Sequence, residues 1–392
     1  MEQGGIHQTN NPQAEQSFQR GRDLLNQGQF TEGERCLEQA LQLSPDHLQA
    51  KVLLAHFCLV THKTDRAESL ISTLNQHRVP AVTRLNLTGQ LHLQRNRAAE
   101  AKALFTESMA LSPTDNAGVG LGIALIQLNQ RDEAERLLRH VIASSQNCAE
   151  AYSALSECIM PGPYYRTVLS QMHSLVNPKT YLEIGVATGD SLQLASPKTR
   201  VIGVDPNPKF TFELEANTSV YCETSDVFFD EYDVLSLFGQ KTIDFCFIDG
   251  LHTFDQALKD FINAEKYASE DAVFVFHDCY PFERTSASRE RQTTFWAGDV
   301  WKVIPILEKY RPDLALHTIQ AAPTGLGVVT GMNPQSSVLE EQFEAIVEEF
   351  MPMDFSYVEE HTAERLHLVK NDRATLESLL PLSDSLKMQS GN

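Results

Sequence analysis

Small residues recur at a fixed interval through the first third of the chain. Gly33, Ala67 and Ala101 are separated by steps of 34 residues. Two other series keep the same step, namely Gly21, Ala55 and Gly89, and the pair Pro45 and Pro113, which are two steps apart. Glycine and alanine allow two helices to cross closely, and proline ends a helix because its ring clashes with the preceding turn. The period therefore predicts stacked pairs of helices, each packed on its neighbours.

A step of 34 residues with small side chains at these places resembles the tetratricopeptide repeat. The segments GQFTEGERCLEQALQLSP (28–45) and RAAEAKALFTESMALSP (97–113) resemble its second helix with the closing proline. We expect an α-helical tetratricopeptide solenoid over 14–160, with a capping helix at 149–159, after a disordered N-terminus at 1–13. Such arrays offer a concave surface, so the resemblance implies a protein partner or self-association.

The pattern changes at MPGPYY (160–165), where two prolines and a glycine interrupt the helical spacing. Apolar runs then alternate with helical segments, which predicts an α/β domain with a mostly parallel, seven-stranded sheet. The expected strands are 180–186, 200–208, 219–226, 243–250, 272–279, 314–321 and 325–331. We place this domain at 161–335, a helical extension at 336–382 and a disordered tail at 383–392. Ligands of such sheets bind beyond the carboxyl ends of the strands.

A loop of small residues follows the first expected strand and should open a helix. Gly185, Ala187 and Gly189 form G-x-A-x-G, which lets a ligand approach the backbone. A dinucleotide site favours a third glycine at the next position, but the chain has Asp190 there, and a carboxylate is a poor neighbour for a pyrophosphate. S-adenosylmethionine carries no phosphate and suits this loop. We expect Asp205, after the second strand, to accept hydrogen bonds from its ribose hydroxyls.

Three more residues are candidates for cofactor binding, each with an alternative. Glu183 binds either the methionine ammonium or a nearby backbone amide. Ser225 and Asp226 either meet the adenine amine or cap a helix.

Together these motifs resemble a class I S-adenosylmethionine-dependent methyltransferase domain with a Rossmann-like fold. The resemblance covers 180–331 and rests on YLEIGVATGDSL, VIGVDPNP, FIDGLHTFDQALKDF and VFVFHDC. These segments look like the branch that acts on hydroxyls of sugars and natural products. The resemblance therefore implies an O-methyltransferase with a small-molecule or glycan acceptor.

The resemblance also implies a catalytic centre. In metal-dependent relatives an aspartate follows the fourth strand, a base comes three residues later, and the fifth strand ends in two adjacent ligands. Asp249, His252 and Asp278 match these positions. Asp249 and Asp278 would hold Mg²⁺, which lowers the pKa of the substrate hydroxyl, and His252 would take the proton as catalytic base. The alternatives are that Asp249 caps the next helix and that His252 is a solvated loop residue.

His277 departs from the family pattern, because a nitrogen ligand is less natural for Mg²⁺. Three interpretations stay open. His277 turns away from the site, or it is a ligand and the metal is Mn²⁺ or Fe²⁺, or no metal binds.

Composition narrows the partners and the compartment. The formal net charge of −20 repels phosphate, which opposes binding to nucleic acid or to anionic membranes. No run of about 18 apolar residues and no signal-peptide core are present, so we expect no membrane association. Seven cysteines without a CxxC pair favour a reducing, cytoplasmic environment.

Two other functions compete with the methyltransferase hypothesis. One is a non-catalytic tetratricopeptide adaptor with a degenerate Rossmann-like domain; the intact loop, Asp205, Asp249 and Asp278 argue against decay. The other is a metal-dependent hydroxylase-like relative, which the His277-Asp278 pair keeps open.

Overall fold

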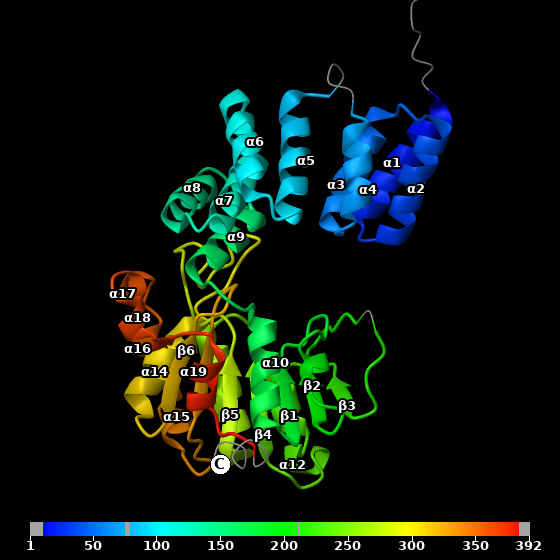
Figure 1. Ribbon diagram of the computed structural model, residues 1–392. Helices are drawn as coiled ribbons and strands as arrows, with labels where there is room; N and C mark the ends of the chain where they lie inside the picture. Colours follow the sequence, from blue (N-terminus) through cyan, green and yellow to red (C-terminus); the bar gives the residue numbers. More distant parts are fainter. Residues whose placement is uncertain (1–10, 75–78, 211, 384–392) are drawn as a thin grey trace, which may run out of the picture. The chain divides into compact units, whose positions relative to one another are not determined.

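The computed structural model describes residues 11–74, 79–210 and 212–383 (Figure 1). The chain divides into two compact units, Met1–Cys158 and Ile159–Asn392. Most residues of the two expected disordered ends lie outside the described ranges. Helix α1, however, already begins at Pro12, and the Asn11 side chain caps it by accepting hydrogen bonds from two backbone amides. No helix of the described residues is long and apolar enough to cross a membrane.

The first unit consists of helices in its described part. They are α1 (Pro12–Asn26), α2 (Phe30–Leu43), α3 (Leu48–Val60), α4 (Thr64–Ser72), α5 (Ala81–Gln94), α6 (Ala98–Leu111), α7 (Asp115–Gln127), α8 (Arg131–Ser144) and α9 (Ala149–Ile159). The small residues of the 34-residue step lie at helix crossings. A Cβ atom added to Gly89 would lie 2.7 Å from the Phe105 ring, and Ala101 is fully buried. The predicted array of packed helices is therefore observed.

The second unit is built on an eight-stranded sheet with the order β3-β2-β1-β4-β5-β7-β6-β8. Its strands are β1 (Thr180–Ile184), β2 (Arg200–Val204), β3 (Thr218–Tyr221), β4 (Ile243–Ile248), β5 (Ala268–Phe276), β6 (Ala315–Ile319), β7 (Leu326–Thr330) and β8 (Leu368–Val369). Strands β1 to β5 are parallel, and β7 is antiparallel to both of its neighbours. The expected number of seven strands is corrected to eight, because the two residues of β8 pair with β6 and are too few to produce a periodic pattern.

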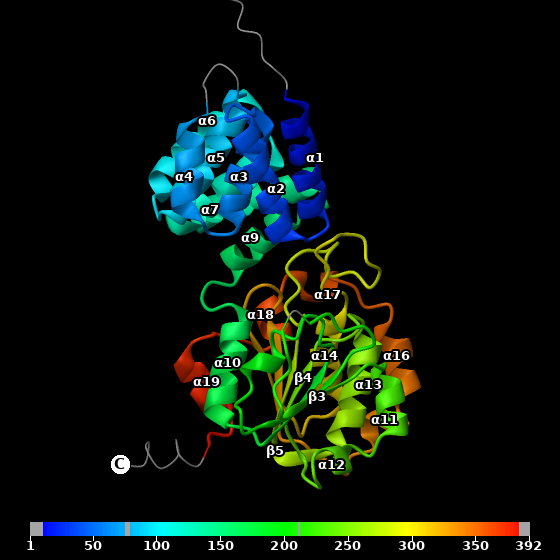
Figure 2. The same cartoon turned by 90° about the vertical axis from the view of Figure 1, so that its right-hand side faces the viewer.

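Helices cover both faces of this sheet (Figures 1 and 2). They are α10 (Tyr165–Val176), α11 (Ser225–Glu231), α12 (Val234–Leu237), α13 (Phe254–Glu265), α14 (Val303–Tyr310), α15 (Val338–Glu341), α16 (Phe343–Phe350), α17 (Ser356–Glu359), α18 (Thr362–Arg365) and α19 (Arg373–Leu379), with 3₁₀ turns η1 (Leu192–Leu194) and η2 (Val300–Lys302). Alternate strand residues enter two cores. Phe245 and Phe247 pack with α10 and α19, whereas Cys246 and Ile248 pack with α13, α14 and α16.

The helix expected directly after the glycine loop is absent from the structure, and only η1 lies between β1 and β2. Side-chain hydrogen bonds hold this segment in turns. Ser191 Oγ donates to Glu183, and Thr188 Oγ1 donates to Asp190. The expectation of a helix here was wrong because short polar side chains compete with helical backbone bonds.

Candidate functional site

The glycine loop after β1 lies directly against the end of β4. Gly185 has a φ of +87°, and a Cβ atom there would overlap the Asp249 carbonyl and lie 2.6 Å from Gly250 Cα. The Asp249 amide donates to the Ile184 carbonyl over 2.8 Å. Only glycine allows this approach, so the loop and Asp249 share one rim of the sheet.

Asp205 holds the glycine loop in place. Its Oδ2 atom accepts hydrogen bonds from the amides of Val186 at 2.9 Å and Ala187 at 2.8 Å. Its Oδ1 atom accepts one from the Asn207 amide at 2.7 Å. Ala187 has a φ of +47°, and Gly189 one of +78°. The residue expected to bind a ribose thus also shapes the loop, and each carboxylate oxygen keeps further acceptor capacity.

Glu183 has partners that the sequence did not suggest. Its side chain is fully buried, and it accepts hydrogen bonds from Ser191 Oγ at 2.6 Å and the Tyr181 hydroxyl at 2.5 Å. Burial raises the pKa of Glu183 to about 8, although these two hydrogen bonds oppose the rise. Glu183 therefore joins β1 to the segment after the loop rather than accepting from a backbone amide, and its role at the methionine ammonium stays a prediction.

Ser225 and Asp226 form the first turn of α11 and face α13. Gln256 Nε2 donates to Ser225 Oγ at 3.3 Å and to Asp226 Oδ1 at 3.2 Å, and Lys259 Nζ lies 2.8 Å from Asp226 Oδ2. The helix cap is Thr224, whose side chain accepts from the Val227 amide. The capping role considered for Ser225 and Asp226 therefore belongs to Thr224, and their role at the adenine stays a prediction.

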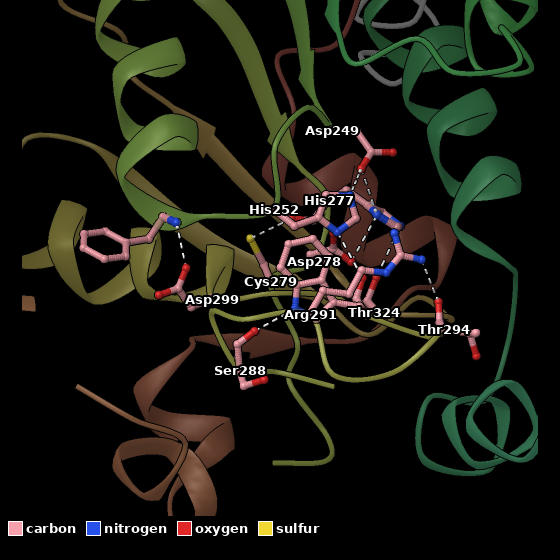
Figure 3. A network of polar contacts seen from close by, with 12 residues as sticks. Asp249, His252, His277, Asp278, Cys279, Ser288, Arg291, Thr294, Asp299 and Thr324 are labelled. Carbon is pink, nitrogen blue, oxygen red and sulfur yellow. Dashed lines mark hydrogen bonds and ion pairs between the residues drawn. The ribbon is translucent and has the colours of Figure 1, made fainter. Parts of the chain in front are cut away.

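Two carboxylates and two imidazoles gather beyond β4 and β5 (Figure 3). Asp249 follows β4, and Asp278, with a φ of +62°, follows β5. His252 Nδ1 lies 3.0 Å from Asp278 Oδ2, and His252 Nε2 lies 3.8 Å from Asp249 Oδ1. One ligand atom each of Asp249, His252 and Asp278 lies within 4.8 Å of the others. Residues that are 29 positions apart in the chain thus form one cluster.

His277 lies between the two carboxylates and does not turn away from them. Its Nδ1 atom is 3.3 Å from Asp249 Oδ1 and 3.3 Å from Asp278 Oδ1. Burial lowers the pKa of His277, but the two negative charges more than offset this and hold the pKa well above its usual value. Burial likewise raises the pKa of Asp278, and the charges of His252 and His277 bring it below its usual value. A charged imidazole therefore relieves the repulsion between the carboxylates.

Two aromatic residues contact the histidines of the cluster. Trp296 stacks on the His252 ring with 5.2 Å between centroids and 13° between planes. The Trp296 carbonyl oxygen is 3.0 Å from His252 Nδ1. The Tyr165 ring, at the start of α10, lies 4.5 Å from the His277 ring. A tryptophan in a polar loop was a visible signal, whereas nothing in the sequence placed Tyr165 here.

The polar loop 280–299 is anchored to the start of α13. Arg289 makes a double hydrogen bond to the Asp255 carboxylate at 2.9 and 3.0 Å. Asp299 Oδ1 accepts from the Phe254 amide at 3.0 Å. Asp299 therefore takes the helix-capping role that was considered for Asp249, and the Asp249 carboxylate faces the cluster instead.

The chemistry of the cluster fits a divalent cation. Asp249 and Asp278 offer oxygen atoms and His252 offers a nitrogen, and a carboxylate–imidazole set suits Mn²⁺ or Fe²⁺ better than Mg²⁺. Asp190, at the position where a dinucleotide site favours glycine, pairs with Arg166 at 2.8 Å.

Comparison with known proteins agrees with this architecture. A family model described as a methyltransferase domain matches residues 182–279, which include part of β1, all of β2 to β5, Asp249 and Asp278. A tetratricopeptide repeat model matches residues 24–84 and 92–158. The chain fuses tetratricopeptide repeats to a methyltransferase domain.

Two similar solved structures each cover less than half of this chain. A thermophilic tetratricopeptide repeat protein of Thermus thermophilus is 20% identical, with 37% of this chain and 80% of that chain covered and a TM-score of 0.34. PilW, a type IV pilus biogenesis factor, is 21% identical, with 38% of this chain and 69% of that chain covered and a TM-score of 0.34. A search of curated proteins found no match to this chain.

Proposed function

We propose that this protein is a cytoplasmic O-methyltransferase, which transfers a methyl group from S-adenosylmethionine to a hydroxyl of a sugar or another small-molecule or glycan acceptor. The observation that carries the proposal is the cluster of Asp249, His252 and Asp278 beside the Gly185 loop. In this proposal the repeat unit binds a protein partner or a second copy of the chain.

The residues of the loop would hold the cofactor. Gly185, Ala187 and Gly189 offer a backbone that a ligand can approach, and Asp205 offers acceptors for ribose hydroxyls. When bound, S-adenosylmethionine supplies an electrophilic methyl group on a positively charged sulfur.

His252 is placed to act as the catalytic base. Its Nδ1 atom lies 3.0 Å from both Asp278 Oδ2 and the Trp296 carbonyl, two acceptors that favour the proton on Nδ1. The lone pair then lies on Nε2. Nε2 would take the proton of the acceptor hydroxyl as that oxygen receives the methyl group. Stacking on Trp296 restrains the imidazole ring in this orientation.

Asp249 and Asp278 would hold a divalent cation with His277 as the nitrogen ligand, because the Nε2 lone pair of His252 is reserved for the proton of the acceptor. When bound, the cation lowers the pKa of the acceptor hydroxyl. The charged His277 ring already neutralises the same carboxylates, so it competes with a cation for them. We therefore expect metal binding to require that the His277 ring lose its proton or move.

Calorimetric titration of the full chain with S-adenosylmethionine tests the proposal first. Absence of binding would support the non-catalytic adaptor and end the enzyme hypothesis. If the cofactor binds, transfer of a labelled methyl group to a panel of sugars and phenols gives the activity. We expect His252→Ala to lower kcat about 10²- to 10⁴-fold, the range of general-base catalysis. His361→Ala, at an exposed loop position, is the matched control and should keep full activity.

The metal role needs its own test. We expect a chelator to abolish transfer, and Mn²⁺ or Fe²⁺ to restore it better than Mg²⁺. Asp249→Asn should lower the metal affinity measured by calorimetry and lower kcat with it. Full activity in the chelated enzyme or in Asp249→Asn would refute the metal role. His252, oriented by Asp278, would then act as the catalytic base without a metal.

A further inference from the structure

The repeat unit contains a groove of about 890 Å³, at the large end of the range for ligand sites. Helices α3, α5 and α7 and the start of α9 line it. Packed helices are spaced by about 8–10 Å, so a groove across four of them is roughly 24–30 Å long. An extended polypeptide advances about 3.3 Å per residue, so this length matches about seven to nine residues.

The groove has an apolar floor. Leu59, Val60, Leu93, Val119 and Ile123 contribute to its lining. Val60 is 63% exposed, which is unusual for a valine in a helix that packs on both sides. An occupant with some apolar side chains would bury this surface.

Side-chain amides line the same groove. They are Gln90, Gln94, Asn96, Asn116, Gln127 and Asn147. A carboxamide presents one acceptor and two donors, so it matches the C=O and N–H groups of an extended main chain. In this structure Gln90 Nε2 donates to the side-chain oxygen of Asn116 over 3.1 Å, and Gln94 Nε2 donates to the Leu59 carbonyl of α3.

The charged residues in the groove have one sign. Asp115 and Glu150 line it, and none of its described lining residues is lysine or arginine. Both acids lie near Cys148: Cys148 Sγ is 3.9 Å from Glu150 Oε2, and burial together with the charges of Glu150 and Asp115 raises the thiol pKa. His56 and His62 also line the groove, but a carboxylate would find no lysine or arginine here, whereas a lysine or arginine would find two acids at one end.

We propose that this groove binds an extended, basic segment of a partner protein, about seven to nine residues long, through its main chain and through lysine or arginine side chains beside Asp115 and Glu150. The proposal specifies the partner left open in the proposed function. It does not depend on methyl transfer, because every residue it uses belongs to the repeat unit.

An array of nine-residue peptides with blocked ends, probed with the full chain, tests the proposal. We expect the bound peptides to be enriched in lysine and arginine near one end and depleted of aspartate and glutamate. The best peptide, fluorescently labelled, then gives a dissociation constant by polarisation. Replacing its basic residues by glutamate or N-methylating its amides should each weaken binding at least about tenfold. Capture of acidic peptides, or of none, would overturn the proposal, as would unchanged binding after N-methylation.

Substitutions in the groove test whether the peptide binds there. Asp115→Asn with Glu150→Gln should weaken binding of the basic peptide about tenfold, whereas Glu107→Gln on α6, exposed and outside the groove lining, should not. Equal affinity in the double variant would contradict the role of these acids.

A bulky thiol label gives a second test that does not rely on charge. Cys148 lines the groove and is partly accessible, and Cys222, in the other unit, is exposed; the remaining five cysteines are buried. We expect a label on Cys148, in a Cys222→Ser background, to block the peptide. A label on Cys222, in a Cys148→Ser background, should leave binding intact. Peptide binding that survives the label on Cys148 would place the site elsewhere, and displacement of the peptide by an uncharged oligosaccharide would reassign the groove to glycans.

Discussion

The two units of the chain bury different kinds of polar side chain. In the described part of the repeat unit, the buried polar side chains are Ser108 and Ser156. The buried polar and charged residues of the methyltransferase unit include His173, Glu183, Asp260, Glu265, His277, Asp278, Asp299, Lys302 and Arg311. Buried charges do not by themselves favour folding, because desolvation opposes their attraction. The repeat unit is held together by close packing, whereas the methyltransferase unit also buries ionisable groups, of which Glu183, His277 and Asp278 belong to the candidate site.

The largest effect should come from breaking a buried ion pair of the methyltransferase unit. Arg311 makes a double hydrogen bond to Glu265 at 2.7 and 2.9 Å, and the two side chains are only 2% and 5% exposed. Arg311→Leu leaves the Glu265 carboxylate buried and unpaired. We expect it to lower the free energy of unfolding of this unit by about 3–5 kcal/mol, measured by urea denaturation.

Two controls sharpen this prediction. The double variant Arg311→Leu/Glu265→Met removes both charges and should recover most of the loss. Lys309→Met breaks an exposed pair with Glu349 and should leave the urea midpoint unchanged. If Arg311→Leu unfolded at the wild-type urea concentration, buried polar groups would not distinguish the two units.

A smaller loss of stability should appear when a fall in pH protonates a buried histidine. The His173 ring is 5% exposed, packs on Tyr181 and Phe245, and has no hydrogen-bond partner among the described residues. Burial lowers its pKa from 6.5 to about 4. The unfolded chain therefore takes up a proton below about pH 6.5, whereas the folded chain does so only near pH 4. The contribution of neutral His173 to the free energy of unfolding is therefore fully present above pH 6.5. It decreases as the pH falls toward 4, by about 3 kcal/mol in total.

The variant His173→Phe isolates that contribution. We expect the difference in unfolding free energy between His173→Phe and the wild type to shift in favour of the variant by about 3 kcal/mol between pH 7 and pH 4. His361→Phe, at an exposed position, should show no such shift. A pH-independent difference for His173→Phe would mean that the folded protein accommodates a charged ring at this place.

The smallest effect concerns close packing in the repeat unit. Phe105 is fully buried, and a Cβ atom on Gly89 would lie 2.7 Å from its ring. Overpacking typically costs about 1–3 kcal/mol, and the better helix propensity of alanine offsets up to about 1 kcal/mol. We expect Gly89→Ala to lower the unfolding free energy of the repeat unit by about 1–2 kcal/mol in thermal or urea denaturation.

The background variant Phe105→Leu tests the cause of that loss. In this background the leucine leaves room, so Gly89→Ala should have little effect or a slight stabilising one. The same loss in both backgrounds would show that Gly89 is required for a reason other than contact with Phe105.

The repeat architecture could be predicted because its contacts are local and identical from one repeat to the next. Gly33, Ala67 and Ala101 occupy equivalent helix crossings, so one packing rule appears as a period in the sequence. The strands β1, β2, β4 and the end of β5 were visible for a related reason, since a strand buried on both faces reads as a continuous apolar run. The two-residue strand β8 has no such run and escaped prediction.

At the candidate site, the sequence by itself determined which chemical groups are available and that Asp249 and Asp278 end neighbouring strands. Only the tertiary structure placed the His277 ring between those carboxylates, gave Glu183 its partners Ser191 and Tyr181, and brought Tyr165 and Trp296 to the imidazoles. The physical reason is that side-chain direction and burial depend on contacts between segments far apart in the chain. Such contacts occur once, follow no period, and become defined only when the sheet and its loops are packed.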